Sequence, residues 1–214
     1  MKISVEKNNI FKSLSHVQSI VEKKNTIPVL SNILIEAKEN SLILSATDMD
    51  ISITETLNCN VIEEGSITVS AHTLFDIIRK LPDGNEVEFI SNDGKMFSIR
   101  SGKSKFSLGC LPKEDFPIIE IVNLKSELSI ESKILLKLIE KTRFAISNEE
   151  TRYFLNGIYF HKRNTENKDC LCIVATDGHR LAKIDFYTEE NISEIPGVII
   201  PKKTIVELCK LLAD

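Results

Sequence analysis

The stretch Ala175-Thr176-Asp177-Gly178-His179-Arg180-Leu181-Ala182 decides the fold, because its first three residues also occur earlier in the chain. It follows an apolar run, Leu171 to Val174, that is typical of a buried strand. Ala46-Thr47-Asp48 repeats the Ala-Thr-Asp triplet at an offset of 129 residues. We infer that the triplet belongs to a duplicated scaffold. Residues 178–181 have no sequence counterpart in residues 49–52, so we expect them to carry function.

Further matches extend the duplication over most of the chain. The offset between matched residues rises from 125 to 131, a small and monotonic drift. Such self-similarity is the signature of an internal repeat. The matches pair Ile3-Ser4-Val5 with Leu128-Ser129-Ile130, Leu30 and Ile33 with Leu155 and Ile158, and Thr73, Leu74, Ile77, Ile78 and Leu81 with Thr204, Ile205, Leu208, Cys209 and Leu212.

Hydrophobic periodicity predicts two β-α-β-β-β units in the first part of the chain. The expected strands are residues 2–6, 32–37, 42–47, 51–57, 66–70, 86–90, 96–100 and 105–110, and the expected helices are residues 7–24 and 73–81. Asp93-Gly94 favours a tight turn between two of these strands, because such turns need positive φ angles.

The pattern divides the chain into a first domain, residues 1–110, a linker, residues 111–126, and a second domain, residues 127–214. Pro112 and Pro117 and the lack of a sustained period indicate the linker. The second domain stops just past its second helix, three strands short of the first domain. We therefore expect it to be incomplete and the chain to be part of a longer protein.

Composition indicates a folded protein without a membrane or export segment. The chain has 214 residues, 42% of them hydrophobic, and no apolar run as long as a membrane span. Its five cysteines are scattered and form no Cys-x-x-Cys pair. This pattern favours reduced thiols, a cytoplasmic location, and neither a metal nor a cofactor.

Positive charge gathers on the predicted helices, although the net charge of the chain is −4. Each of the four helices, two per domain, is net positive when its immediate ends are included, and Lys12 lies on the first. Lys133, Lys137 and Lys141 recur every fourth residue, which places them on one helix face. If all helices lie on one side of the sheets, they form a basic surface suited to the phosphate backbone of DNA and indifferent to base sequence.

The chain resembles the beta subunits of DNA polymerase III, the bacterial sliding clamps. The stretches that carry this resemblance are residues 26–32, 100–108, 111–117, 152–157 and 175–182, which read TIPVLSN, RSGKSKFSL, LPKEDFP, RYFLNG and ATDGHRLA. The resemblance implies an α+β DNA clamp fold of repeated β-α-β-β-β units, with helices on one side of antiparallel sheets. In this family three such domains form a chain and two chains close into a homodimeric ring. The third domain is then absent here.

The resemblance also implies a function that is not enzymatic. The ring encircles double-stranded DNA without sequence preference and confers processivity by tethering the replicative polymerase. Family positions that face DNA match Lys24, Thr73, Glu149, Tyr153 and Phe154. Glu149 and Thr73 depart from the amide or basic residues often found there. Tyr153 and Phe154 are of a type that stacks on bases without sequence preference.

Two further surfaces follow from the resemblance. A cleft that binds apolar peptides of the polymerase alpha subunit, the clamp loader and repair polymerases matches Leu155, Thr176, Gly178, His179, Arg180 and Leu181. Its far wall lies beyond residue 214 in the family, so we expect weak peptide binding. The ring-closing dimer interface matches Leu74, Ile78, Arg100, Lys103, Lys105, Phe106 and Leu108. Without a third domain we expect no closed ring.

Three alternatives remain open from the residues alone. Asp177 and His179 could serve a hydrolase, although the chain lacks a G-x-S-x-G motif, an H-E-x-x-H motif and a P-loop. Cys170, Cys172 and His179 could bind zinc, but no fourth ligand is evident. The chain could also be a repeat scaffold without a nucleic-acid role.

Overall fold

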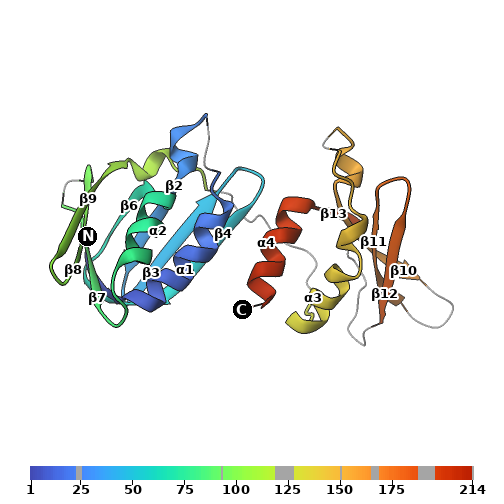
Figure 1. Cartoon of the computed structure of the whole chain (residues 1–214), viewed down its shortest axis with the longest axis horizontal. Helices are drawn as coiled ribbons and strands as arrows, with labels where there is room; N and C mark the ends of the chain where they lie inside the picture. The colour runs from blue at the N-terminus through green and yellow to red at the C-terminus, as the bar shows by residue number, and fades with distance from the viewer. Residues whose placement is uncertain are drawn as a thin grey trace. The chain divides into compact units, whose positions relative to one another are not determined.

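The computed structural model describes residues 1–22, 26–92, 94–118, 128–149, 151–164, 169–187 and 196–213. The chain forms two compact units, Met1–Glu120 and Ile121–Asp214, which we call unit 1 and unit 2 (Figure 1). Within the described residues, no helix is both long enough and apolar enough to cross a membrane. Each unit is described by itself below.

Unit 1 is built from one antiparallel sheet and two helices. The sheet has the order β4-β3-β2-β6-β9-β8-β7-β1-β5, and α1 and α2 contact one another over it. Its elements are β1 (Lys2–Glu6), α1 (Lys7–Ile20), the 3-10 helix η1 (Pro28–Ser31), β2 (Asn32–Lys38), β3 (Ser41–Thr47), β4 (Ser52–Asn58), β5 (Asn60–Glu63), β6 (Gly65–Ser70), α2 (Ala71–Lys80), β7 (Glu86–Ile90), β8 (Met96–Ser101), β9 (Ser104–Leu111) and the 3-10 helix η2 (Lys113–Asp115).

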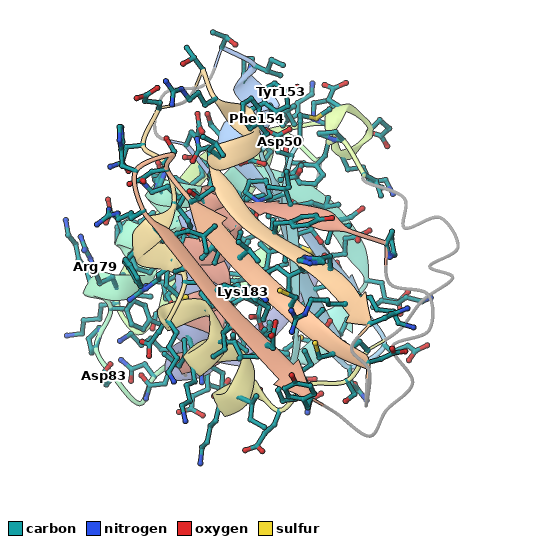
Figure 2. All side chains as sticks on the ribbon, turned by 90° about the vertical axis from the view of Figure 1, so that its right-hand side faces the viewer. Asp50, Arg79, Asp83, Tyr153, Phe154 and Lys183 are labelled. Atoms are coloured by element: carbon teal, nitrogen blue, oxygen red, sulfur yellow. The ribbon has the colours of Figure 1, made fainter. Side chains whose placement is uncertain are left out.

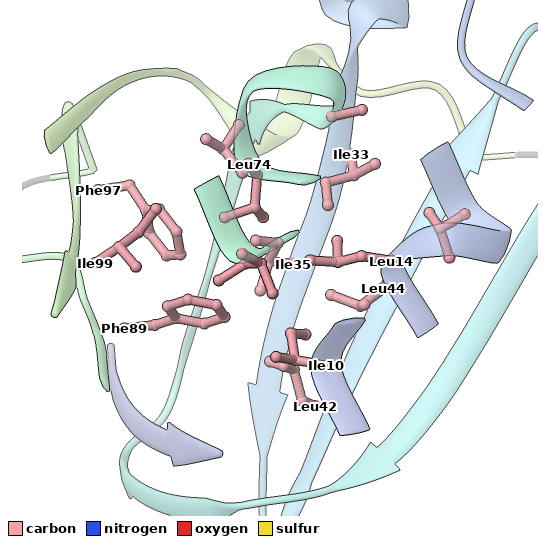
Figure 3. Close-up of a cluster of buried hydrophobic side chains, with 14 of the residues drawn as sticks. Ile10, Leu14, Ile33, Ile35, Leu42, Leu44, Leu74, Phe89, Phe97 and Ile99 are labelled. Atoms are coloured by element: carbon pink, nitrogen blue, oxygen red, sulfur yellow. The ribbon is translucent and has the colours of Figure 1, made fainter. Parts of the chain in front are cut away.

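The core of unit 1 lies between the helices and the sheet. Ile10 and Leu14 lie four residues apart on α1, so both point to one face of the helix and are fully buried. Phe89 on β7 and Phe97 on β8 meet with ring centroids 4.9 Å apart on the other side of the cluster (Figure 3). The helices therefore cover one face of the sheet and leave the opposite face for solvent or partners.

Unit 2 repeats this plan with a smaller sheet in the order β12-β11-β10-β13. Leu138 and Ile139 on α3 and Ile205 on α4 are buried against Ile158 and Ile173 of the sheet. Its elements are α3 (Ser132–Glu140), the 3-10 helices η3 (Arg143–Ala145) and η4 (Tyr153–Leu155), β10 (Gly157–Asn164), β11 (Asp169–Thr176), β12 (Leu181–Tyr187), β13 (Val198–Pro201) and α4 (Lys202–Ala213).

The two units share the same strand register. In unit 1, Leu34 of β2 lies opposite Ser45 and Thr68 on the neighbouring strands. In unit 2, Tyr159 of β10 lies opposite Val174 and Ile199. Leu34 and Tyr159, Ser45 and Val174, and Thr68 and Ile199 are therefore equivalent positions. They are separated by 125, 129 and 131 residues, the offsets that the sequence repeat predicts. Equivalent positions can therefore be compared residue by residue.

Several predicted elements differ from the structure. Residues 128–130, which match Ile3-Ser4-Val5 in the repeat, are not in a strand as those residues are. Strand β1 is held by β7 and β5, and the described part of unit 2 has no strand equivalent to β7. The first helix ends at Ile20, where Val21 turns to extended angles. Strand β5, Asn60–Glu63, was not predicted, because its four residues are too few to show an alternating pattern.

The predicted linker begins inside unit 1. Strand β9 continues to Leu111, and η2 then turns the chain so that Phe116 is only 6% exposed and packs with Val29 and Leu34. Leu111 and Phe116, both within the predicted linker, therefore belong to the packing of unit 1. Residues 119–126, the rest of the predicted linker, lie outside the described residues.

Two predicted interface residues are core residues instead. Leu74 and Ile78 on α2 are fully buried among the helices and sheet of unit 1. They cannot contact a second chain without opening the core. The helical spacing of these leucine and isoleucine side chains indicates an apolar face, but it does not say which surface covers that face.

This correction predicts a clear difference between two substitutions. Leu74→Ala removes fully buried methyl groups and should lower the free energy of unfolding of unit 1 by about 2–5 kcal/mol. Phe106→Ala on β9, where the side chain is 37% exposed, should cost less than about 1 kcal/mol. Urea titration followed through amide signals of unit 1 measures both. Equal costs would contradict the assignment of Leu74 to the core.

Candidate functional site

The residues after β11 form a turn that satisfies its own hydrogen bonds. The Asp177 carboxylate accepts hydrogen bonds from the backbone N–H of His179, at 3.0 Å, and of Arg180, at 2.9 Å. The Thr176 hydroxyl donates to the Arg180 carbonyl oxygen, at 2.7 Å. Gly178 has φ +90°, a left-handed conformation that costs glycine little. The turn therefore presents residues 178–181 in a fixed conformation at the end of the sheet.

The same turn follows β3 in unit 1. The Asp48 carboxylate accepts from the N–H of Asp50 and Ile51, at 3.0 and 2.7 Å, and the Thr47 hydroxyl donates to the Ile51 carbonyl oxygen, at 2.8 Å. Met49, with φ +80°, takes the place of Gly178. Residues 178–181 thus have a structural counterpart in residues 49–52, contrary to the sequence comparison. The two turns differ only in the side chains that they present.

Asp177 holds the turn and is not arranged as a general base. The backbone N–H groups of Arg180 and His179 lower its pKa to about 2, and the Arg180 guanidinium adds to the shift. Its link to residue 179 uses the backbone N–H rather than the imidazole. This arrangement gives no support to a hydrolase that uses Asp177 and His179.

The cysteines considered for zinc are buried in the sheet of unit 2. Cys170 and Cys172 are at most 1% exposed, whereas His179 lies in the exposed turn. Burial and the nearby Asp185 carboxylate raise the pKa of Cys172 to about 11. In the part of the chain that the structure describes, no three His, Cys, Asp or Glu side chains come together as metal ligands.

A cavity of about 300 Å³ opens beside this turn. Its wall is mostly apolar, and Phe154, Tyr159 and Ile199 in it are 55%, 40% and 43% exposed. Exposed apolar groups gathered in a hollow are typical of a binding surface. The residues that line the cavity are Phe154, Leu155, Gly157, Tyr159, Val174, Ala175, Thr176 and Ile199.

Gly157 sets the shape of this cavity. A Cβ atom added there would lie 2.5 Å from the Ile200 carbonyl oxygen and 2.8 Å from Cγ2 of Ile199. Only glycine therefore lets β13 approach the start of β10. The close approach places Ile199 beside Tyr159 at the rim of the cavity.

The structure brings the predicted peptide-cleft residues to one end of the unit 2 sheet. Leu155 and Thr176 line the cavity, and Gly178, His179, Arg180 and Leu181 lie in the exposed turn, where Leu181 is 63% exposed. The Arg180 guanidinium lies 5.8 Å from the centre of the Phe144 ring. Tyr159, Val174 and Ile199 were missed from the sequence, although each is an apolar residue at an outward strand position.

The DNA-facing candidates that the structure describes are exposed. Lys12 on α1, Thr73 on α2, and Lys133 and Lys137 on α3 face solvent, as does Lys141 after α3. The Glu149 carboxylate forms an ion pair with Arg152, at 2.9 Å, which offsets its negative charge. Lys24 lies outside the described residues.

Tyr153 and Phe154 form an exposed aromatic pair. Their ring centroids are 5.5 Å apart in an edge-to-face arrangement, and Tyr153 is 79% exposed. Figure 2 shows both beyond the end of the sheet, whereas Lys183 lies along β12. Phe154 also lines the cavity, so the DNA and peptide candidates meet at this segment.

The other interface candidates lie on, or next to, an open strand edge of unit 1. Strand β9 pairs with β8 from Ser104 to Gly109, but with β6 only at Cys110 and Leu111. Among the described residues, 104–109 therefore leave one backbone edge unpaired. Lys105 and Phe106 are exposed on this strand, and Leu108 is half-buried. Arg100 on β8 and Lys103 in the turn before β9 are exposed beside it.

Two repeated units, each with two helices on one side of an antiparallel sheet, define a DNA clamp architecture. The family model of the DNA polymerase III beta subunit N-terminal domain matches residues 1–120, and that of its central domain matches residues 129–214. The chain therefore belongs to the DNA polymerase III beta subunit family.

Relatives and solved structures agree with this assignment. The beta sliding clamp of Caulobacter vibrioides is 47% identical over 213 residues, which are 99% of this chain and 57% of that protein. That of Rickettsia felis is 39% identical over 214 residues, 100% of this chain and 55% of that protein. A Bartonella birtlesii clamp solved with griselimycin bound has a TM-score of 0.96 and 46% identity, with 100% of this chain and 57% of that chain covered. The chain thus spans little more than half the length of these relatives.

The lowered pKa of Asp177 predicts a pH-dependent contribution to stability. Because its pKa falls from 3.8 to about 2 on folding, the contribution is full above pH 4 and is lost as the pH falls through 2. Asp177→Asn should therefore destabilise unit 2 at pH 7, and its difference from the unsubstituted chain should shrink steadily below pH 4. Urea unfolding at pH 7 and at several pH values below 4 measures this difference in stability. Asp169→Asn, at the far end of β11, serves as control; a pH-independent difference for Asp177→Asn would contradict the role of the carboxylate.

Proposed function

We propose that this chain contributes the first two units of a sliding clamp, a protein without catalytic activity that encircles double-stranded DNA and confers processivity on DNA polymerase III. The observation that carries the proposal is the row of exposed lysines formed by Lys133 and Lys137 on the outward side of α3 and Lys141 at its C-terminal cap. The opposite side of α3 is buried through Leu138 and Ile139, so the helix presents a charged face by construction. We also propose that the protein acts in the cytoplasm, where DNA is replicated.

Contacts of this kind hold DNA without stopping its movement. Lysine side chains attract phosphate oxygens, which are the same in every base pair, so no position along the duplex is preferred. Lys12 on α1 extends the same chemistry to unit 1. The exposed Tyr153 and Phe154 add apolar contact, and pairing with Arg152 reduces the repulsion between Glu149 and phosphate.

Replacing the lysine row tests the DNA interface. The triple substitution of Lys133, Lys137 and Lys141 to Gln should weaken duplex binding at low salt and reduce the slope of log affinity against log salt by about 2–3. Fluorescence anisotropy of a labelled duplex at several salt concentrations measures the slope. A control triple, Lys38, Lys103 and Lys105 to Gln, removes the same charge from strands and turns of unit 1. If both triples change the slope equally, the helix face is not the DNA interface.

The second proposed surface tethers partners. The apolar cavity and the exposed Leu181 suit the leucine or aromatic side chains of a partner peptide, and His179 and Arg180 supply donors at the rim. The partners proposed are the polymerase alpha subunit, the clamp loader and repair polymerases. Tethering raises the effective concentration of a polymerase at the primer end without further contacts.

Griselimycin, which the Bartonella relative binds, can be used to test this proposed surface. We expect it to shift methyl NMR signals of Leu155, Thr176 and Leu181 in this chain, with weak affinity. Leu181→Ala should reduce the affinity at least fivefold, because it removes an exposed apolar contact beside the cavity. The matched control is Tyr187→Ala, because Tyr187 is a large side chain of similar exposure, 54%, at the other end of β12. Shifts confined to residues outside this end of the sheet would exclude the assignment.

Ring closure is proposed for the open edge of β9. An unpaired strand edge from Ser104 to Gly109 can add a strand from a second chain, with Phe106 as an apolar contact. Arg100, Lys103 and Lys105 surround it with positive charge, which suits an acidic partner edge. The homodimeric ring proposed for the complete protein uses this edge.

A further inference from the structure

The cavity of unit 2 has an equivalent in unit 1. By the shared strand register, Tyr159 of unit 2 is equivalent to Leu34 of unit 1, and Ile199 is equivalent to Thr68. In the helical segments before β10 and β2, Phe154 is equivalent to Val29. In unit 2 these three side chains are 40–55% exposed. In unit 1 none of the three equivalents exceeds 8%.

A segment of the chain itself covers the unit 1 position. Phe116 packs in one cluster with Val29 and Leu34, and Leu111 adds to it. The η2 turn positions the Phe116 ring. It is closed by a hydrogen bond from the Phe116 N–H to the Lys113 carbonyl oxygen, at 3.0 Å. Proline at positions 112 and 117 restricts the backbone on both sides of this turn.

The segment is also held by polar contacts. The Thr68 hydroxyl donates to the Leu111 carbonyl oxygen, at 2.8 Å, and accepts from the Asn32 side-chain amide, at 3.2 Å. The equivalent residues in unit 2 are Ile199 and Gly157, which offer no side-chain donor. Unit 1 therefore has polar side chains that hold this segment, whereas unit 2 has none at these two positions.

We propose that residues 111–116 are a built-in ligand: Phe116 closes, in unit 1, a latent site for an aromatic side chain that is equivalent to the open cavity of unit 2. Removal of the ring opens this site to an added aromatic ligand. The proposal does not depend on DNA binding or on peptide binding by unit 2, because occupant and site both lie within unit 1.

The whole chain with Phe116→Ala tests the proposal, with N-acetyl-phenylalanine amide as the probe. We expect saturable shifts of the methyl signals of Val29 and Leu34 in this variant. The unsubstituted chain and Phe116→Leu, which refills the site, should shift at least fivefold less. Ile118→Ala, which removes a 75% exposed side chain two residues further on, should behave like the unsubstituted chain. Equal responses in Phe116→Ala and Phe116→Leu would overturn the proposal.

A second variant keeps the test decisive if Phe116→Ala does not fold. Thr68→Ala removes the hydroxyl that holds Leu111 but leaves the ring in place. Hydrogen exchange of the Phe116 amide should then accelerate at least tenfold, because the segment leaves its site more often. The amide of Ile99 in the core should be unaffected. An unchanged Phe116 amide would show that the segment is not held as a ligand.

Discussion

The burial of paired helices against one face of a sheet is the constraint on which this structure depends. In unit 1, Ile10, Leu14 and Leu74 fill the space over the strands, and in unit 2 Ile139 and Ile205 do the same. A sheet covered in this way has only its outer face, its strand ends and its edges left for partners. The candidate sites fall on these places and on the outward side of the helices, and no enzyme-like cleft is required to explain them.

Much of this plan could be predicted because alternation and helical spacing are local signals. Strands β1 and β7 begin and end where the alternation of residues 2–6 and 86–90 predicts. The signals fail where structure depends on distant partners. Residues 128–130 alternate as β1 does, yet they form no strand, because the described residues of unit 2 include no neighbour equivalent to β7. Leu74 and Ile78 show an apolar face, but only the fold shows that unit 1 itself covers it.

The candidate site was predicted in part for a similar reason. Residues 176–181 are contiguous, so their shared turn is visible in the sequence, and the resemblance supplied Leu155. Tyr159, Val174 and Ile199 come from three separate strands and meet only through register. Phe116 lies in a proline-bounded stretch that is typical of a linker, and its role follows from packing that no local pattern records.

Gly157 limits how far the two units can be exchanged. Its counterpart in unit 1 is Asn32, whose amide belongs to the polar contacts around Leu111. Asparagine cannot occupy position 157, because the backbone of Ile200 already fills the space of its Cβ atom. The duplicated copies have thus diverged in backbone spacing as well as in side chains. A chimaera that moved the unit 1 pocket into unit 2 would also have to replace β13, the strand beside Gly157. Single residues at these positions can therefore no longer be exchanged between the two units.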